Sequence, residues 1–242
     1  MNLSIVIPAF NEEKLLTSCL EAIGSAGERL TKRGWDWEVI VCDNNSSDAT
    51  AEIASSLGAR VVAEPVNQIG RARNRGASVA QGEWLLFVDA DSLVSPLLFE
   101  ELMEAVSSGK IVGGGACLTV TEKNLGQLML PIHIWNGISR LFSYAAGSFL
   151  FCRRDVFEGL EGFSLQRYAG EELDLSRRLK RAGKKEGLKF RILRKGRLRT
   201  SARKLELYST WEILSMFLKV IVRYKGTTGS RDACFLWYDG RR

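Results

Sequence analysis

The first part of the chain alternates short apolar runs with stretches of helical periodicity. An unbroken apolar run predicts a strand buried on both faces, whereas apolar residues three and four positions apart predict an amphipathic helix. This pattern predicts strands at 3–7, 38–42, 60–63 and 84–88, and helices at 12–26, 49–57, 69–80 and from Pro96 to just before Gly109. Strands that alternate with helices are typical of a mostly parallel sheet flanked by helices.

The rhythm changes after three consecutive glycines, Gly113 to Gly115. The following residues predict strands at 116–120 and 148–152 and a helical stretch around 125–142. A further helix is predicted at 171–182, ending at Gly183, because glycine is favoured just beyond the last turn of a helix. The fold class is therefore α/β, with a mostly parallel first half and a smaller, mixed second half.

The positive charge of the chain is concentrated in one stretch. Residues 151–204 hold 17 Lys and Arg against 7 Asp and Glu, whereas the whole chain has a net charge of +6. Such a stretch can bind phosphates, an anionic membrane face or nucleic acid, or it can be a solvated helix face. No apolar run is long enough to span a bilayer. Residues 211–222, interrupted by Glu212 and Lys219, predict an amphipathic helix that packs on the core or contacts a membrane.

The cysteines argue against a disulfide framework and against a zinc site. They are five in number, widely spaced, and form no C-x-x-C pair. A reducing compartment suits such a chain best. The first residues run directly into an apolar strand without a basic segment, which predicts no signal peptide. We therefore expect a cytoplasmic protein.

Polar residues gather where the predicted strands end. The segments Pro8 to Glu12, Asp43 to Asp48 and Asp89 to Ser92 each follow a predicted strand. In an open parallel sheet, ligands bind beyond the carboxyl ends of the strands, so these segments are expected to share one binding edge. The alternative is that the Asn, Ser and Asp residues of the second segment only cap the helix that follows.

The pair Asp89 and Asp91 is suited to a metal ion. Two carboxylates two positions apart at a strand end can reach one hard cation that bridges diphosphate oxygens, and Mg²⁺ or Mn²⁺ is the natural choice. The alternative is a capped turn. The loop after the first strand has neither G-x-G-x-x-G nor G-x-x-x-x-G-K-[ST], which disfavours a dinucleotide dehydrogenase and a P-loop NTPase.

Six motifs resemble, in order and spacing, those of the family 2 glycosyltransferases. They cover roughly residues 3–204 and read SIVIPAFNEE (4–13), VIVCDNNSSDAT (39–50), GRARNRGA (70–77), GEWLLFVDADS (82–92), GSFLFCRRDVFEGLEGF (147–163) and AGEELDLSRRLKRAG (169–183). The resemblance implies a GT-A fold, a Rossmann-like sheet with a mixed acceptor-side region. It divides the chain into a donor half at 1–115, an acceptor half at 116–204, and a C-terminal helical extension at 205–242.

The resemblance also implies roles for residues of the donor half. Pro8, Phe10 and Glu12 would line the nucleoside pocket, and Asp43 would accept a hydrogen bond from the base. Arg73 would lie near the base or the diphosphate. The implied ligand is a UDP- or GDP-sugar.

The implied metal ligand is chiefly Asp91, and Asp89 would lie beside the ribose or the metal. Ala90, between the two aspartates in the chain, would belong to the nucleotide-sugar site. Where the family usually has Glu-Asp, with the aspartate as general base, this chain has Glu171 and Glu172. Glu172 occupies the place of the base but is one methylene longer, which leaves the choice between the two glutamates open. The positive end of the helix dipole is expected to keep Glu172 ionised near neutral pH. The alternative is that both glutamates only complement that dipole.

A carboxylate base and a metal-stabilised leaving diphosphate predict sugar transfer to an acceptor hydroxyl, and the family implies inversion. Two other functions stay open: a sugar nucleotidyltransferase, and a nucleotide-sugar-binding module without turnover. Beyond residue 199 we find only Thr200-Ser201-Ala202-Arg203-Lys204 where many relatives carry a His or a basic aromatic motif. The acceptor is unspecified; a lipid-linked acceptor with contact to the inner face of a membrane is expected, and nucleic acid is not.

Overall fold

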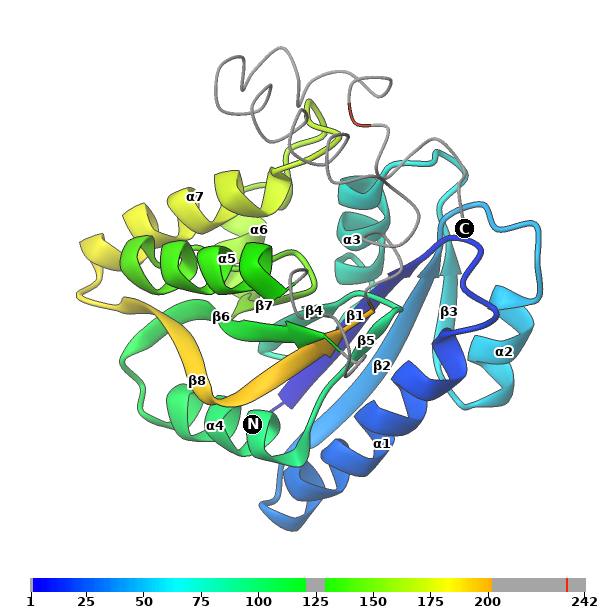
Figure 1. The fold of residues 1–242 in the computed structure, drawn as a ribbon, viewed down its shortest axis with the longest axis horizontal. Helices are drawn as coiled ribbons and strands as arrows, with labels where there is room; N and C mark the ends of the chain where they lie inside the picture. The colour runs from blue at the N-terminus through cyan, green and yellow to red at the C-terminus, as the bar shows by residue number, and fades with distance from the viewer. Residues whose placement is uncertain (1, 121–128, 202–233, 235–242) are drawn as a thin grey trace.

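The computed structural model describes residues 2–120, 129–201 and 234 of the chain. Its centre is an eight-stranded sheet with the strand order β3-β2-β1-β4-β7-β6-β8-β5 (Figure 1). The strands are β1 (Asn2–Ala9), β2 (Asp36–Asp43), β3 (Arg60–Ala63), β4 (Trp84–Val88), β5 (Ser92–Leu93), β6 (Ile111–Val120), β7 (Phe149–Arg153) and β8 (Lys189–Thr200). The helices are α1 (Leu16–Lys32), α2 (Thr50–Ser56), α3 (Ile69–Ala77), α4 (Pro96–Ser107), α5 (Met129–Phe142), α6 (Arg154–Gly159) and α7 (Glu171–Lys185).

The sheet has a parallel part and a mixed part, as the sequence predicts. Strands β3, β2, β1 and β4 are parallel neighbours. Strand β7 runs antiparallel to both β4 and β6, β8 runs parallel to β6, and β5 runs antiparallel to β8. The antiparallel β7 therefore joins the donor-side strands to the acceptor-side strands in one continuous sheet.

Two hydrophobic clusters, one on each face of the sheet, explain the unbroken apolar runs. In β1, Leu3, Ile5 and Ile7 belong to the cluster that also holds residues of α1 and α4. Val6 points to the other cluster, which contains residues of α3, α6 and α7. Side chains alternate between the faces of a strand, so β1 can be buried at every position from Leu3 to Ala9 only because helices cover both faces.

Three glycines that the sequence suggested would separate elements lie inside strand β6, which begins at Ile111 rather than at residue 116. A Cβ at Gly114 would overlap the carbonyl oxygen of Arg191 in β8, and a Cβ at Gly115 would come within 2.6 Å of Ala145 Cβ. The glycines are therefore needed for close packing against neighbouring backbone. They do not interrupt the strand.

The predicted end of α7 at Gly183 is also wrong. The helix runs through Gly183 to Lys185, and Gly187, with φ of 71°, lies just beyond it. The N–H of Leu188 donates to the carbonyl of Gly183, as in a Schellman motif. Gly183 is instead a packing residue, because a Cβ there would lie 2.6 Å from Cγ1 of Val112.

Other boundaries differ by a few residues, and three short or polar elements were not predicted. Helix α1 begins four residues later than predicted, at Leu16, because residues 13–15 form a turn in which the N–H of Leu15 donates to the carbonyl of Glu12. Strands β5 and β8 and helix α6 had no clear apolar signature. The predicted helix at 211–222 and the extension at 205–242 lie outside the described residues, apart from Cys234.

Strand β8 occupies much of the basic stretch, which the sequence interpretation considered as a helix face. Its buried residues, among them Phe190, Ile192 and Leu198, alternate with exposed basic ones. The buried carboxylate of Glu101 in α4 accepts hydrogen bonds from the backbone N–H groups of Arg194, Lys195 and Gly196. This contact fixes an irregular part of β8 and sets the course of the strand toward Thr200.

Within the described part of the chain, no helix combines the length and hydropathy needed to cross a membrane.

Candidate active site

A cleft lies where β4 ends and α7 begins. Its volume is about 280 Å³. Asp89 and Asp91 follow β4, whereas Glu171 and Glu172 form the first turn of α7. Other walls of the cleft come from Ile69, Arg73, Leu118, Ile132, Gly147, Ser148, Tyr168, Ala169, Gly170, Thr200 and Ser201. The cleft thus brings together the acidic residues that the sequence singled out in both halves.

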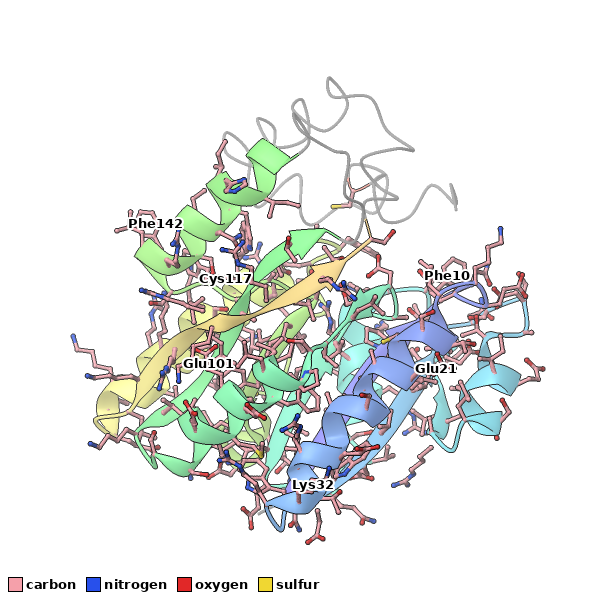
Figure 2. The ribbon with its side chains drawn as sticks, turned by 60° about the horizontal axis from the view of Figure 1, so that its bottom comes forward. Phe10, Glu21, Lys32, Glu101, Cys117 and Phe142 are labelled. Carbon is pink, nitrogen blue, oxygen red and sulfur yellow. The ribbon has the colours of Figure 1, made fainter. Side chains whose placement is uncertain are left out.

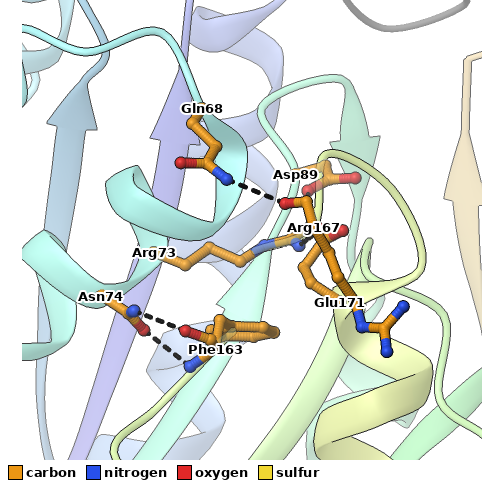
Figure 3. Close-up of polar contacts among 7 residues, drawn as sticks. All are labelled: Gln68, Arg73, Asn74, Asp89, Phe163, Arg167 and Glu171. Carbon is orange, nitrogen blue, oxygen red and sulfur yellow. Dashed lines mark hydrogen bonds and ion pairs between the residues drawn. The ribbon is translucent and has the colours of Figure 1, made fainter. Parts of the chain in front are cut away.

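Arg73 is the electrostatic centre of the cleft wall (Figure 3). Its side chain is 2% exposed, and its two terminal nitrogens bind different carboxylates. Nη1 lies 2.6 Å from Glu171 Oε1, and Nη2 lies 2.9 Å from Asp89 Oδ1. Burial alone would lower the pKa of Arg73, but the charges of Asp89 and Glu171 outweigh it and raise the pKa. Arg73 is therefore a fixed cation that joins α3, β4 and α7.

The space around Arg73 is shaped to hold its guanidinium group. A Cβ at Gly147 would lie 2.7 Å from Nη2, so this position must stay free of a side chain. The ring of Phe163 lies 5.2 Å from the guanidinium carbon, within cation–π range. The resemblance placed Arg73 near the base or the diphosphate. In the structure its terminal nitrogens hold the two carboxylates.

Two amide side chains hold the loop that leads into α7. Gln68 Nε2 donates to the carbonyl oxygens of Leu165 and Arg167, each at 2.9 Å. Asn74 exchanges two hydrogen bonds with the backbone of Phe163, donating to its carbonyl and accepting from its N–H (Figure 3). The sequence analysis gave these residues no role, although Asn74 lies within the motif GRARNRGA and Gln68 just before it. They position the start of α7, and with it Glu172.

The expectation that Glu172 is ionised near neutral pH is wrong for the ligand-free cleft. Burial in the cleft, followed by the negative charge of Glu171, raises the pKa of Glu172 well above that of a free glutamate. Arg73 and a backbone hydrogen bond lower it, but they do not outweigh the other two effects. The shift is thus opposite to the one expected from the helix dipole, because desolvation in the cleft penalises the charged form of the half-buried Glu172 carboxylate.

This pKa predicts a pH-dependent effect of Glu172→Gln on stability in metal-free buffer. Because the folded protein holds the Glu172 proton more tightly than the unfolded chain, this side chain stabilises the fold at acid pH. That contribution is lost as the pH rises from the ordinary glutamate value toward the raised one. Glutamine keeps a neutral side chain at every pH. We therefore expect the Tm of Glu172→Gln to rise relative to that of the wild type between pH 5 and pH 8. A Tm difference that stays constant over this range would contradict the raised pKa.

The residues assigned to the nucleoside pocket lie at the ends of β1 and β2, away from the walls of the described cleft. Pro8 and Glu12 are buried, whereas Phe10 and Asp43 are half-buried. Asp43 lies beside Ala9 in the sheet register and accepts a hydrogen bond from the N–H of Ser46. Their role toward a base stays a prediction.

Several polar residues after β2 serve the local structure, which is the alternative left open for that segment. Asn44 accepts from the N–H of Gln68 and donates to the carbonyls of Glu64 and Val66. Asp48 Oδ1 accepts from the backbone N–H of Thr50. Asn44 therefore orders the chain that leads into α3, where Arg73 lies.

The oxygen atoms of the cleft fit a hard divalent cation. Asp89 and Asp91 line it on either side of the buried Ala90. Glu171 Oε2 is buried and has no hydrogen-bond partner among the described residues. The described residues contain no cluster of three His, Cys, Asp or Glu side chains that could hold a metal by themselves. One or two carboxylates completed by substrate phosphates and water are the usual way in which proteins bind Mg²⁺.

The sequence profile of Glycosyl transferase family 2 matches residues 4–160. The chain belongs to this family. The match contains the ends of β1, β2 and β4 and therefore the donor-side wall of the cleft. Membership confirms the resemblance to this family and places the chain among the glycosyltransferases, although the sixth motif, at 169–183, lies beyond the matched residues.

Characterised relatives match part of the chain. A poly(ribitol-phosphate) beta-glucosyltransferase of Bacillus spizizenii is 33% identical over 101 residues, which is 39% of this chain and 15% of the relative. A dolichyl-phosphate beta-glucosyltransferase, ALG5C of Trichomonas vaginalis, is 33% identical over 135 residues, 50% of this chain and 40% of the relative. The chain thus spans less than half the length of these relatives.

Solved structures share the fold at low sequence identity. Glucosyl-3-phosphoglycerate synthase of Mycobacterium tuberculosis, solved with Mn²⁺, UDP-glucose and phosphoglyceric acid, superposes with a TM-score of 0.62 at 20% identity, covering 91% of this chain and 77% of that one. S. aureus TarS (residues 1–349) gives a TM-score of 0.63 at 17% identity, covering 91% and 65%. The predicted GT-A fold is therefore confirmed.

Proposed function

We propose that this protein transfers a sugar from a UDP- or GDP-sugar to an acceptor hydroxyl, with inversion and with the help of Mn²⁺ or Mg²⁺. The observation that carries the proposal is the cleft, in which the acidic end of β4 faces the two glutamates that open α7. The donor half, residues 1–115, would hold the nucleotide sugar, and residues 116–204 would hold the acceptor. The solved relative that binds Mn²⁺ and UDP-glucose supports this choice of ligands.

In the proposed site Asp91, with Asp89, holds the cation. A bound cation would supply positive charge against the diphosphate that leaves the sugar. Asp89 shares its charge with Arg73, so Asp91 is the stronger ligand of the two. The rigid ion pair keeps the Asp89 carboxylate in place without rearrangement when the donor binds, which is how preorganised groups contribute to catalysis.

Glu172 is proposed to be the general base. Glu171 Oε1 lies 2.6 Å from Arg73 Nη1, so this oxygen already has a charged partner. Glu172 lines the same cleft, and its raised pKa makes it a stronger base than an ordinary carboxylate once its proton is lost. We propose that it takes the proton of the acceptor hydroxyl while that oxygen attacks the anomeric carbon from the face opposite the diphosphate.

The experiment is a turnover assay with UDP- and GDP-sugars that detects the released nucleoside diphosphate, run with Mn²⁺, with Mg²⁺ and with EDTA. We expect metal-dependent release from one nucleotide series, because water can take the place of the acceptor hydroxyl when no acceptor is present. Donor binding without release would favour the binding module, and formation of a sugar nucleotide from a nucleoside triphosphate would favour the nucleotidyltransferase. Either result would contradict the proposal.

We also propose that the protein acts in the cytoplasm at the inner face of a membrane on a lipid-linked acceptor. The basic stretch at 151–204, which contains α7 and β8, supports this part of the proposal because positive charge is attracted to an anionic membrane face.

A further inference from the structure

Helix α5 exposes a row of large apolar side chains, which ends at Phe142 (labelled in Figure 2). Ile134, Ile138, Leu141 and Phe142 are 55%, 39%, 76% and 54% exposed. Their spacing of four, three and one places them along one side of the helix. Isolated apolar residues on a surface need no explanation, but four on one helix face form a continuous patch of the kind that marks an interaction surface.

Polar contacts on the opposite side of α5 fix this orientation. The side chain of Asn136 accepts from the N–H of Leu118 and donates to its carbonyl, both at 2.8 Å. Ser139 is fully buried, and its hydroxyl donates to the carbonyl of Tyr144 at 2.7 Å. The helix therefore points Asn136 and Ser139 inward and the four apolar residues outward. Rotating it to bury the apolar row would break the two hydrogen bonds that bind Asn136 to β6.

A basic stripe on α7 borders the apolar row. Arg177, Lys180, Arg181 and Lys184 are spaced three, one and three positions apart and follow one side of α7, which lies beside α5 (Figure 1). Lys180 Nζ donates to the carbonyl of Phe142 at 2.7 Å. Arg177 donates to the hydroxyl of Tyr144 at 3.1 Å. These contacts place the stripe at the C-terminal end of the apolar row.

We propose that this α5–α7 face, the four apolar residues of α5 together with the four basic residues of α7, docks on an anionic lipid bilayer. Apolar side chains at the level of the acyl chains and cations at the level of the headgroups are the arrangement by which amphipathic surfaces bind membranes. The stripe contains four cations and no acidic residue, so its charge is complementary to the uniformly anionic surface of such a bilayer.

The position of α5 links this face to the cleft. Ile132, two residues before the first exposed isoleucine, lines the cleft. A bilayer that contacts α5 would therefore lie within a turn or two of the helix from the cleft wall. The proposal extends the membrane contact proposed above and names the surface, but its test needs neither donor nor turnover, so it can fail while the transferase activity stands.

The experiment is sedimentation of the full chain with vesicles of phosphatidylcholine alone or with 30 to 40% phosphatidylglycerol, roughly the anionic range in which basic surfaces bind. We expect co-sedimentation with the anionic vesicles that weakens as salt is raised, because screening removes the electrostatic part. The double variant Ile138→Ser/Leu141→Ser should bind at least tenfold more weakly, and Arg181→Gln/Lys184→Gln should lose the preference for anionic lipid.

Matched controls alter the same residue types elsewhere. Leu57 and Leu97 are 44% and 48% exposed, and Leu57→Ser/Leu97→Ser should bind vesicles like the wild type. All variants should keep the wild-type Tm, since the changed side chains are exposed. Failure of the wild type to sediment, or equal binding by the α5 variant, would overturn the proposal. So would a dimer in light scattering that Ile138→Ser/Leu141→Ser converts to a monomer, because the face would then bind a second copy.

Discussion

Glu172→Gln is expected to slow sugar transfer by about 10²–10⁴-fold, the usual contribution of a general base, while donor affinity changes little. Glutamine has nearly the same shape as glutamate, but its amide cannot take the proton from the acceptor hydroxyl. The reduction should appear in kcat and kcat/KM equally, because the lost interaction exists only in the transition state. Steady-state kinetics and a direct donor-binding measurement together check this result.

The control is Asp174→Asn, two residues further along α7 and therefore on a different side of the helix. Asp174 pairs with Arg178 at 2.8 Å, so its charge serves the helix surface and its loss should leave kcat near the wild-type value. Glu172→Asp, which restores the residue usual in the family, should retain part of the activity. If Glu172→Gln is fully active and Glu171→Gln folds but is inactive, the assignment of the two glutamates is reversed.

Arg73→Met is expected to lower the free energy of unfolding by about 3–5 kcal/mol, since removing one partner of a buried ion pair leaves an uncompensated charge. Here Glu171, whose side chain is 4% exposed, loses its cation, and Asp89 loses a hydrogen bond at 2.9 Å. Arg73→Lys should recover only part of the loss, because an ammonium group lacks the planar fork that reaches two carboxylates. Denaturant unfolding with a two-state fit measures the difference.

Arg75→Met supplies the comparison within the same helix. Arg75 is exposed on α3, and a substitution there should change stability by about 0.5 kcal/mol or less. The double variant Arg73→Met/Glu171→Gln should be more stable than Arg73→Met alone, because one of the two stranded charges is removed. Equal stability of Arg73→Met and the wild type would show that the ion pairs do not join the two halves.

Features that depend on strand periodicity could be predicted from the sequence. The runs at 60–63 and 84–88 gave strand boundaries that match the structure. The run at 84–88 is apolar at every position because β4 is buried on both faces. Asp89, Asp91, Glu171 and Glu172, which the sequence singled out, all line one cleft, and their roles in metal binding and proton transfer stay predictions.

Features that depend on contacts between distant segments could not be predicted. The partners of Arg73 lie 16 and 98 residues away in the chain, and nothing local to Arg73 indicates that it is buried. Strand β8 was missed because its exposed face is almost entirely basic, which hides the apolar alternation. Gly183 was misinterpreted for a related reason: its use is to let α7 approach Val112, which is far away in the sequence. The pKa of Glu172 likewise depends on burial that the helix position alone does not reveal.

The central claim is that Asp89 and Asp91 form a metal-dependent nucleotide site. The most direct test is a thermal-shift titration with UDP and with GDP, each in the presence of Mn²⁺ or of EDTA. A ligand that binds only the folded protein raises Tm. We predict a rise with one nucleotide that requires Mn²⁺ and is absent in Asp91→Asn, while Asp174→Asn responds like the wild type. No shift with either nucleotide in the presence of Mn²⁺, or an equal shift in Asp91→Asn, would contradict the account.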